Sequence, residues 1–155
     1  MDIDRENFFA APTLANEWVT LEPLSGEHAD ALAAAVGDLH ELWYQDHIPS
    51  ISEVPEYIER LLGEDNRVAW TIVNPDGTPV GVTTYLHLDP VNRNLEIGST
   101  WIGADFQGGA LNPAAKLLLL QRAFEDLRCL RVEIRTHYMN RQSRAAIEKV
   151  GAKLD

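Results

Sequence analysis

The sequence predicts an α+β fold in which helices flank one central mixed β-sheet, a mixed α/β arrangement. Stretches with alternating apolar residues, typical of half-buried strands, are interspersed with stretches that begin at a capping residue and continue with helical periodicity. The chain has 155 residues and 45% of them are hydrophobic, which suits a single domain with a substantial core. One long connection contains a helix, so we expect it to join two parallel strands by a right-handed crossover.

The first half of the chain predicts one strand followed by two helices. Apolar and polar residues alternate over residues 18–24, which indicates a strand. Ser25 is a suitable N-cap for a helix over residues 26–36. A polar and aromatic connection follows. The second helix is expected to begin at Ser52, on a capping pattern, and to end near Gly63.

The middle of the chain predicts a β-hairpin. Residues 67–74 and 79–88 are rich in β-branched and aromatic side chains, which are common in strands. The residues between them, 75–78, read Pro-Asp-Gly-Thr, and each of the first three favours a tight turn for its own physical reason. We therefore expect these two strands to be antiparallel neighbours.

A strand–loop–helix junction follows the hairpin and is the most informative part of the sequence. The strand covers residues 95–102, and Ser99 interrupts its apolar row, which consists of Leu95, Ile97 and Trp101. The loop covers residues 103–111. Asn112 is then expected to be the N-cap of a helix over residues 113–127, because proline at position 113 suits the first helical position.

Gly108 and Gly109 indicate that this junction could bind a ligand. Glycine lets the backbone approach a ligand closely, and the backbone N–H groups and helix dipole at such a junction favour a phosphate or pyrophosphate. The alternative is a simple turn, because glycines are common before helices in α/β proteins.

The chain is expected to close with one strand and one helix. Residues 130–137 alternate as a strand. Asn140 is a candidate N-cap for a helix over residues 141–150, and Gly151 is suited to end that helix. The strands at 95–102 and 130–137 are the pair expected to be parallel.

Composition argues against several classes of protein. The formal net charge of −11 argues against nucleic acid as the main partner and favours an amine-bearing substrate. No apolar run approaches the roughly 20 residues that span a bilayer, and the acidic start MDIDRENFF does not resemble a secretory signal. The single cysteine, Cys129, cannot form an internal disulfide, and no metal-ligand spacing is present. We therefore expect a cytoplasmic protein without a metal.

Three segments of the sequence carry a family resemblance. They are LEIGSTWIGADFQGGALNPAAKLLL (residues 95–119), RVEIRTHYMNRQSRAAIEKVGA (131–152) and VTLEPLSGEHADAL (19–32). Together with the order of elements, they resemble the GNAT superfamily of N-acetyltransferases, and within it the RimJ/RimL-like subgroup of ribosomal-protein N-terminal acetyltransferases. The first segment is similar to the family's acetyl-CoA motif, and the second to its other conserved motif. The resemblance implies one GNAT-like domain over residues 1–155.

Two departures from the family pattern stand out. The pyrophosphate loop of the family usually reads Q/R-x-x-G-x-G/A, but here Ala110 stands at the fourth position and Asn112 at the last small one, and Pro113 lacks an N–H donor. The family also continues past the final glycine into two further strands, whereas this sequence ends at Asp155. We therefore expect a C-terminally truncated domain, or a sheet that a partner completes.

The resemblance implies acetyl-CoA as co-substrate and indicates where it binds. Its pantetheine arm is expected to pair with the strand at Thr100, Trp101 and Ile102, as an added strand would. The other expected contacts are Gln107, Gly108, Gly109, Ala110, Leu111 and Asn112 in the loop, with Asn140 and Arg144 near the end of the chain.

Acetyl transfer to an amine needs a base for the amine and a proton for the leaving thiolate. Glu96 is the leading candidate for the base, because it is the acidic residue of an apolar strand and burial would raise its pKa. The alternative is a structural carboxylate paired with an arginine. Ser143 and Tyr138 are the candidate proton donors, although Ser143 also fits the first turn of a helix.

The resemblance implies that Trp43 and Tyr44 line the acceptor site, where aromatic side chains would suit a cationic amine. His87, near the end of a predicted strand, is expected to line the same site. The alternatives are a hydrophobic anchor for Trp43 and a surface position for the histidine. The sequence therefore predicts an acetyl-CoA-dependent N-acetyltransferase that acts on a primary amine, either a protein N-terminus or a small molecule. A non-catalytic acyl-CoA-binding module and a homodimeric scaffold with an empty cleft are the other hypotheses.

Overall fold

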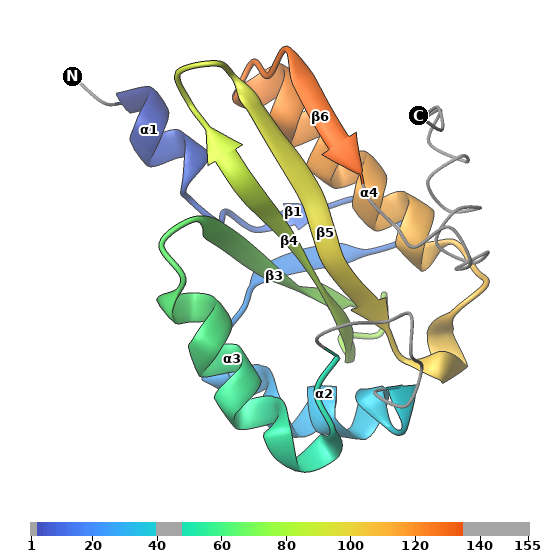
Figure 1. The fold of residues 1–155 in the computed structure, drawn as a ribbon. Helices are drawn as coiled ribbons and strands as arrows, with labels where there is room; N and C mark the ends of the chain where they lie inside the picture. Colours follow the sequence, from blue (N-terminus) through green and yellow to red (C-terminus); the bar gives the residue numbers. More distant parts are fainter. Residues whose placement is uncertain (1–2, 40–47, 135–155) are drawn as a thin grey trace.

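The computed structural model describes residues 3–39 and 48–134, which form one mixed sheet with helices on both faces (Figure 1). The strands are β1 (Leu14–Ala15), β2 (Thr20–Pro23), β3 (Arg67–Val73), β4 (Pro79–Asp89), β5 (Asn94–Ile102) and β6 (Arg131–Ile134). They lie side by side in chain order. Neighbouring strands are antiparallel except β5 and β6, which are parallel. The predicted mixed sheet is thereby confirmed.

The helices of this part of the chain form two layers. They are α1 (Ile3–Phe8), α2 (Ala29–Val36), α3 (Val54–Gly63) and α4 (Leu111–Gln121). Helix α4 covers one face of the sheet, and α2 and α3 cover the other (Figure 1). Shorter helical turns lie at Gly26–His28, Ile51–Glu53 and Ala104–Phe106, and a π-helical stretch at Arg122–Asp126 follows α4. None of the described helices is long and apolar enough to cross a membrane.

Each face of the sheet has its own hydrophobic core. On the α4 face, Tyr85 of β4 packs in one cluster with Leu119 of α4. On the opposite face, Trp101 of β5 packs in a second cluster with Leu32 of α2 and Ile58 of α3. Burial of apolar surface on both faces stabilises the sheet between its two helical layers.

The apolar row predicted for the strand at residues 95–102 divides between the two cores. Ser99 and Thr100 together lie opposite one residue of β4, which is a β-bulge, and Ser99 has a φ of 51°. The extra residue reverses the alternation of side chains. As a result, Ile97 lies in the α4 core and Trp101 lies in the core beneath α2 and α3. The prediction of one shared row was wrong.

The start of the second helix also differs from the prediction. Ser50, rather than Ser52, is the capping residue, because its side chain and that of Glu53 form a capping box. The cap of the first helix is confirmed, since Ser25 Oγ accepts the N–H of Glu27 at 3.1 Å. A helical turn at Gly26–His28 intervenes before α2 begins.

The N-terminal elements were not predicted. Helix α1 brings Phe8 into the α4 core, where 1% of its surface is exposed, and β1 adds an edge strand next to β2. Strand β6 confirms the predicted parallel partner of β5. The remainder of that predicted strand and the final helix lie outside the described residues.

Candidate active site

Strand β5 continues beyond the residues that pair with the described part of β6. Within residues 3–39 and 48–134, β6 pairs with β5 from Asn94 to Ile97, and the bulge at Ser99 follows. Among the strands that the structure describes, none pairs with this edge beyond Ile97. This half of β5 is the segment to which the pantetheine arm is expected to hydrogen-bond as an additional strand would.

Thr100, Trp101 and Ile102 form this second half of β5. Thr100 Oγ1 lies 2.8 Å from the hydroxyl oxygen of Thr83, and the indole N–H of Trp101 donates to the hydroxyl of Tyr57 at 3.2 Å. Burial raises the pKa of Tyr57 to about 12, so this phenol stays neutral at physiological pH. These contacts hold the side chains on the two faces of the sheet, away from the strand's edge.

The loop after β5 leads into α4 and is held tightly at its start. The N–H of Gly103 donates to the carbonyl oxygen of Val80 at 2.8 Å. A Cβ at this position would lie 2.5 Å from the carbonyl oxygen of Ala35, so the close approach of β5 to α2 requires glycine. Gln107 turns back and donates from Nε2 to the carbonyl oxygen of Ile102 at 2.7 Å.

Helix α4 begins at Leu111, earlier than predicted. Ala110 is the N-cap, and its carbonyl oxygen accepts the N–H of Ala114 at 2.9 Å. Asn112 is therefore not the cap but the second helical residue. Pro113 suits the third position because the first four N–H groups of a helix have no intrahelical acceptor.

The start of α4 is suited to a phosphate group. Gly108 has a φ of 82°, a left-handed conformation that favours glycine. No atom of the described residues lies within 4 Å of the position that a Cβ would take at Gly108 or Gly109, so this part of the chain leaves the loop backbone open to a ligand. The N–H groups of Leu111 and Asn112 lead the helix at the positive end of its dipole. The residues present therefore fit a pyrophosphate, although Ala110 replaces the motif glycine.

A buried lysine in α4 was missed by the sequence reasoning. Only 4% of the surface of Lys116 is exposed, and its Nζ donates to Asn112 Oδ1 at 3.1 Å. Burial lowers the pKa of Lys116 to about 8. The signal that could have revealed it was a lysine in the apolar stretch AAKLLLL of a predicted helix.

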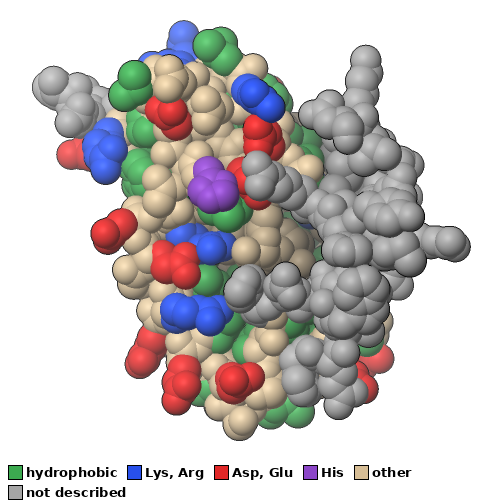
Figure 2. All heavy atoms as spheres, in the orientation of Figure 1, with side chains coloured by type: hydrophobic (Ala, Val, Ile, Leu, Met, Phe, Trp, Pro, Cys, Tyr) green, Lys and Arg blue, Asp and Glu red, His purple; other side chains and the backbone are tan. Residues whose placement is uncertain are grey.

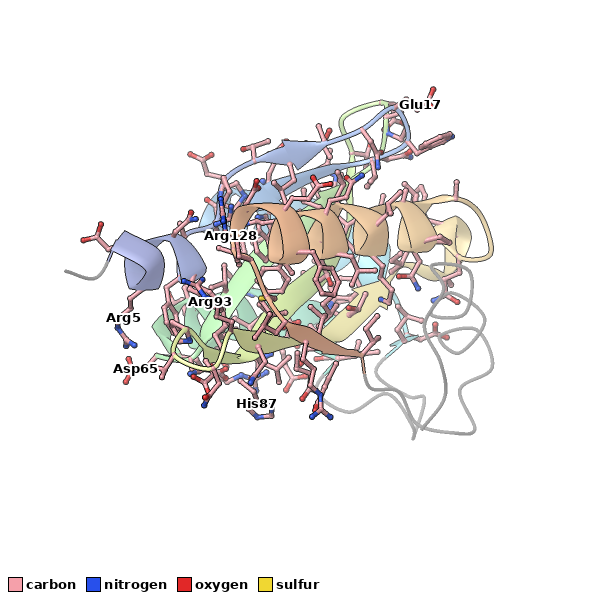
Figure 3. The ribbon with its side chains drawn as sticks, turned by 90° about the horizontal axis from the view of Figure 1, so that it is seen from above. Arg5, Glu17, Asp65, His87, Arg93 and Arg128 are labelled. Carbon is pink, nitrogen blue, oxygen red and sulfur yellow. The ribbon has the colours of Figure 1, made fainter. Side chains whose placement is uncertain are left out.

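Glu96 and His87 are in contact, and Figure 3 shows His87 on the side of the sheet away from α4. Glu96 is 6% exposed, and its Oε1 lies 2.9 Å from Nδ1 of His87. The side chain of His87 is 68% exposed. Its backbone has a φ of 49° at an irregularity in the pairing of β4 with β5, a conformation that is costly for residues other than glycine. This turn of the strand places an exposed imidazole against a buried carboxylate.

Further polar groups surround this pair on the same face. Arg67 of β3 donates to the hydroxyl oxygens of Thr84 at 3.0 Å and Ser99 at 2.9 Å. Glu133 of β6 lies in register with Glu96. Figure 2 shows acidic and basic side chains gathered with a histidine on this exposed face. The face therefore offers charged and hydrogen-bonding groups rather than an apolar surface.

The structure thus brings part of the predicted site together. The second half of β5, the loop and the start of α4 are continuous, and Glu96 lies earlier on the same strand next to His87. Six predicted site residues lie outside the described residues: Trp43, Tyr44, Tyr138, Asn140, Ser143 and Arg144. Within residues 3–39 and 48–134, no group of three or more His, Cys, Asp or Glu side chains could hold a metal ion.

Comparison with known sequences places the chain in a family. The GNAT acetyltransferase domain matches residues 19–153, and the chain belongs to this family. A curated relative from Bacillus subtilis (strain 168), "Putative ribosomal N-acetyltransferase YdaF", is 41% identical over 76 residues. That alignment spans 49% of this chain and 41% of the relative.

Solved structures support the same assignment. A GCN5-related N-acetyltransferase from Brucella melitensis has a TM-score of 0.81 at 26% identity, covering 92% of this chain and 67% of that one. RimJ from Mycobacterium smegmatis, solved in complex with CoA-disulfide, has a TM-score of 0.74 at 23% identity, covering 91% of this chain and 73% of that one. The predicted GNAT-like fold and the resemblance to ribosomal N-acetyltransferases are confirmed.

Proposed function

We propose that this chain transfers an acetyl group from acetyl-CoA to a primary amine. The observation that carries the proposal is the continuity of the site along one strand. Buried Glu96, the second half of β5 at residues 100–102 and the start of α4 follow one another along the chain. A base, an edge for an extended arm and a site for phosphate are the parts that this reaction needs.

The proposed chemistry begins with the amine. Glu96 accepts a proton from the protonated amine, directly or through water, so that the nitrogen gains a free electron pair. The nitrogen then forms a bond to the thioester carbonyl carbon, and the bond between that carbon and sulfur breaks. The thiolate takes a proton from Tyr138 or Ser143, and the oxyanion left on that residue takes the second proton from the acylated nitrogen, so that the products are the neutral amide and the free thiol of CoA. Much of the rate enhancement comes from holding the amine and the thioester in line.

His87 gives Glu96 a route for its proton. Its Nδ1 lies 2.9 Å from Glu96 Oε1, and its side chain is largely exposed. The imidazole can therefore accept the proton that Glu96 has taken and exchange it with water. This role adds to the acceptor-binding role predicted for His87, which it shares with Trp43 and Tyr44 in the proposal.

The acceptor is proposed to be the N-terminal amine of a protein. The support is the identity to a relative named as a ribosomal N-acetyltransferase. A small primary amine is the alternative acceptor. A cytoplasmic location and a homodimer remain predictions, the first supported by a single cysteine that is buried and unpaired in the described part of the chain.

The decisive experiment measures release of free thiol from acetyl-CoA by the purified chain. Peptides with a free N-terminus, the same peptides with an acetylated N-terminus and a panel of small amines are compared. We expect release only with free N-terminal amines. A folded chain that binds acetyl-CoA but releases thiol with no amine would instead be a binding module.

Glu96→Gln tests the assigned base in the same assay. We expect kcat/KM to fall about 100-fold, the usual order for loss of a general base, with the Kd for acetyl-CoA unchanged. Glu22→Gln is the matched control, because Glu22 also contacts a histidine, His28, at 3.2 Å on another strand. Equal losses in both variants would contradict the assignment of Glu96.

A further inference from the structure

The side chain of Lys116 is buried in the second turn of α4. Its ammonium lies 3.1 Å from Asn112 Oδ1, and Asn112 is in the first turn of the same helix. Helical side chains lean toward the N-terminus of their helix, and here that direction leads to the loop that is proposed to bind phosphate. Lys116 therefore places a positive charge next to the first turn of α4.

This charge lacks a counter-charge in the described part of the chain. An ammonium has three donors, and its one described acceptor is the neutral amide of Asn112. No described carboxylate forms an ion pair with Lys116. Buried charges in proteins are normally paired, because removing an isolated ion from water is costly. The donors that remain thus suit an anion.

The ionisable groups on the neighbouring elements do not supply that anion. On α4 and its π-helical extension, Arg122 pairs with Asp126 at 3.6 Å, and the hydroxyl of Tyr85 donates to the carbonyl of Leu119. Glu96 lies on the opposite face of the sheet. The only cause of the lowered pKa of Lys116 is burial, so no described charge acts on it appreciably.

We propose that the ammonium of Lys116 binds the phosphate groups of acetyl-CoA, and that Lys116 takes up a proton when this ligand binds. The inference rests on the proposed use of acetyl-CoA and adds to it a residue outside the loop pattern. A lysine that is partly neutral without the ligand becomes fully charged beside a phosphate. The affinity for acetyl-CoA should therefore fall as the pH rises above about 8, because burial lowers the pKa of Lys116 to this value.

Calorimetric titration with acetyl-CoA, without any acceptor amine, tests both parts of the proposal. At pH 8, titrations in HEPES and in Tris give the number of protons taken up from the difference in apparent enthalpy. We expect uptake of about half a proton per acetyl-CoA, as for a group half protonated beforehand. In Lys116→Met this uptake should vanish and the Kd should rise at least about tenfold, as for loss of a charge-assisted hydrogen bond.

Two controls separate the outcomes. Arg128→Met removes one exposed positive charge near the other end of α4 and should leave both the Kd and the proton uptake unchanged. Circular dichroism establishes that each variant is folded. If Lys116→Met keeps the Kd or the uptake of the parent chain, the role of Lys116 is overturned while the proposed function stands. If the folded parent chain does not bind acetyl-CoA, both proposals fail.

Discussion

At the scale of single residues, two buried ionisable side chains lie on opposite faces of the sheet. Glu96 faces the layer of α2 and α3 and contacts His87, whereas Lys116 lies in α4 on the other face. The sequence singled out Glu96 because an acidic residue in an apolar strand is unusual. It did not reveal the contact with His87, because that contact depends on the irregular turn of β4.

The backbone of His87 offers a test of this turn. Its φ of 49° favours glycine, so His87→Gly should have a higher free energy of unfolding than His87→Ala by about 1 kcal/mol. Both variants lose the imidazole, so that loss cancels. Urea unfolding measures the difference. At Leu86, which does not have a positive φ, the order should be reversed, because glycine weakens an ordinary strand. The same order at both sites would argue against the strained turn.

The buried lysine predicts how stability depends on pH. The pKa of Lys116 is about 8 in the folded chain and 10.5 when unperturbed, so below pH 8 its burial costs about 3 kcal/mol. Between pH 8 and pH 10.5 the unfolded chain binds more protons than the folded chain. The free-energy cost of burying Lys116 therefore disappears as the pH rises through this range.

Lys116→Met should therefore be more stable than the parent chain at pH 7, and its advantage should shrink toward pH 10. Urea unfolding of both proteins at the two pH values gives the comparison. Ionisation of the buried Tyr57 and Cys129, whose pKa values burial raises, affects both proteins alike and cancels in the difference. A difference in stability that did not change with pH would mean that Lys116 is not buried as a charge.

At the scale of elements, the junction of β5 with α4 combines two kinds of glycine. Gly103 is required by a close contact with Ala35, so it serves the fold. No described atom lies within 4 Å of the position that a Cβ would take at Gly109, and its φ is not positive, so packing of the described residues does not require glycine there. A residue that the fold does not require can be tested for a role in binding alone.

Gly109→Ala should leave the free energy of unfolding unchanged but weaken acetyl-CoA binding about tenfold, or 1.4 kcal/mol. The added methyl group lies where the ligand phosphate is proposed to approach the backbone. Chemical unfolding and calorimetric titration measure the two effects. Gly63→Ala, at a glycine in the last turn of α3 whose Cβ position has no described atom within 4 Å, should leave the Kd unchanged, while its free energy of unfolding rises by up to about 1 kcal/mol because alanine favours a helix. An unchanged Kd for Gly109→Ala would place the phosphate elsewhere.

At the scale of the whole molecule, the helical layers on the two faces of the sheet support different parts of the candidate site. Helix α4 and its core support the loop proposed for the cofactor, and α2 and α3 line the face that carries Glu96 and His87 (Figure 1). Strand β5 belongs to both sides because its bulge turns side chains from one face to the other. The acidic net charge of −11 is consistent with an amine acceptor and a ligand whose phosphates meet local positive groups.

The sequence by itself determined the order of strands and helices from β2 onward, the hairpin at residues 75–78 and the family. These features depend on local periodicity, turn chemistry and motifs, which neighbouring residues specify. Only the tertiary structure decided the reversal at Ser99, the contact of His87 with Glu96 and the burial of Lys116. Each of these depends on strand register and on helix packing, which bring together residues that are distant in the sequence.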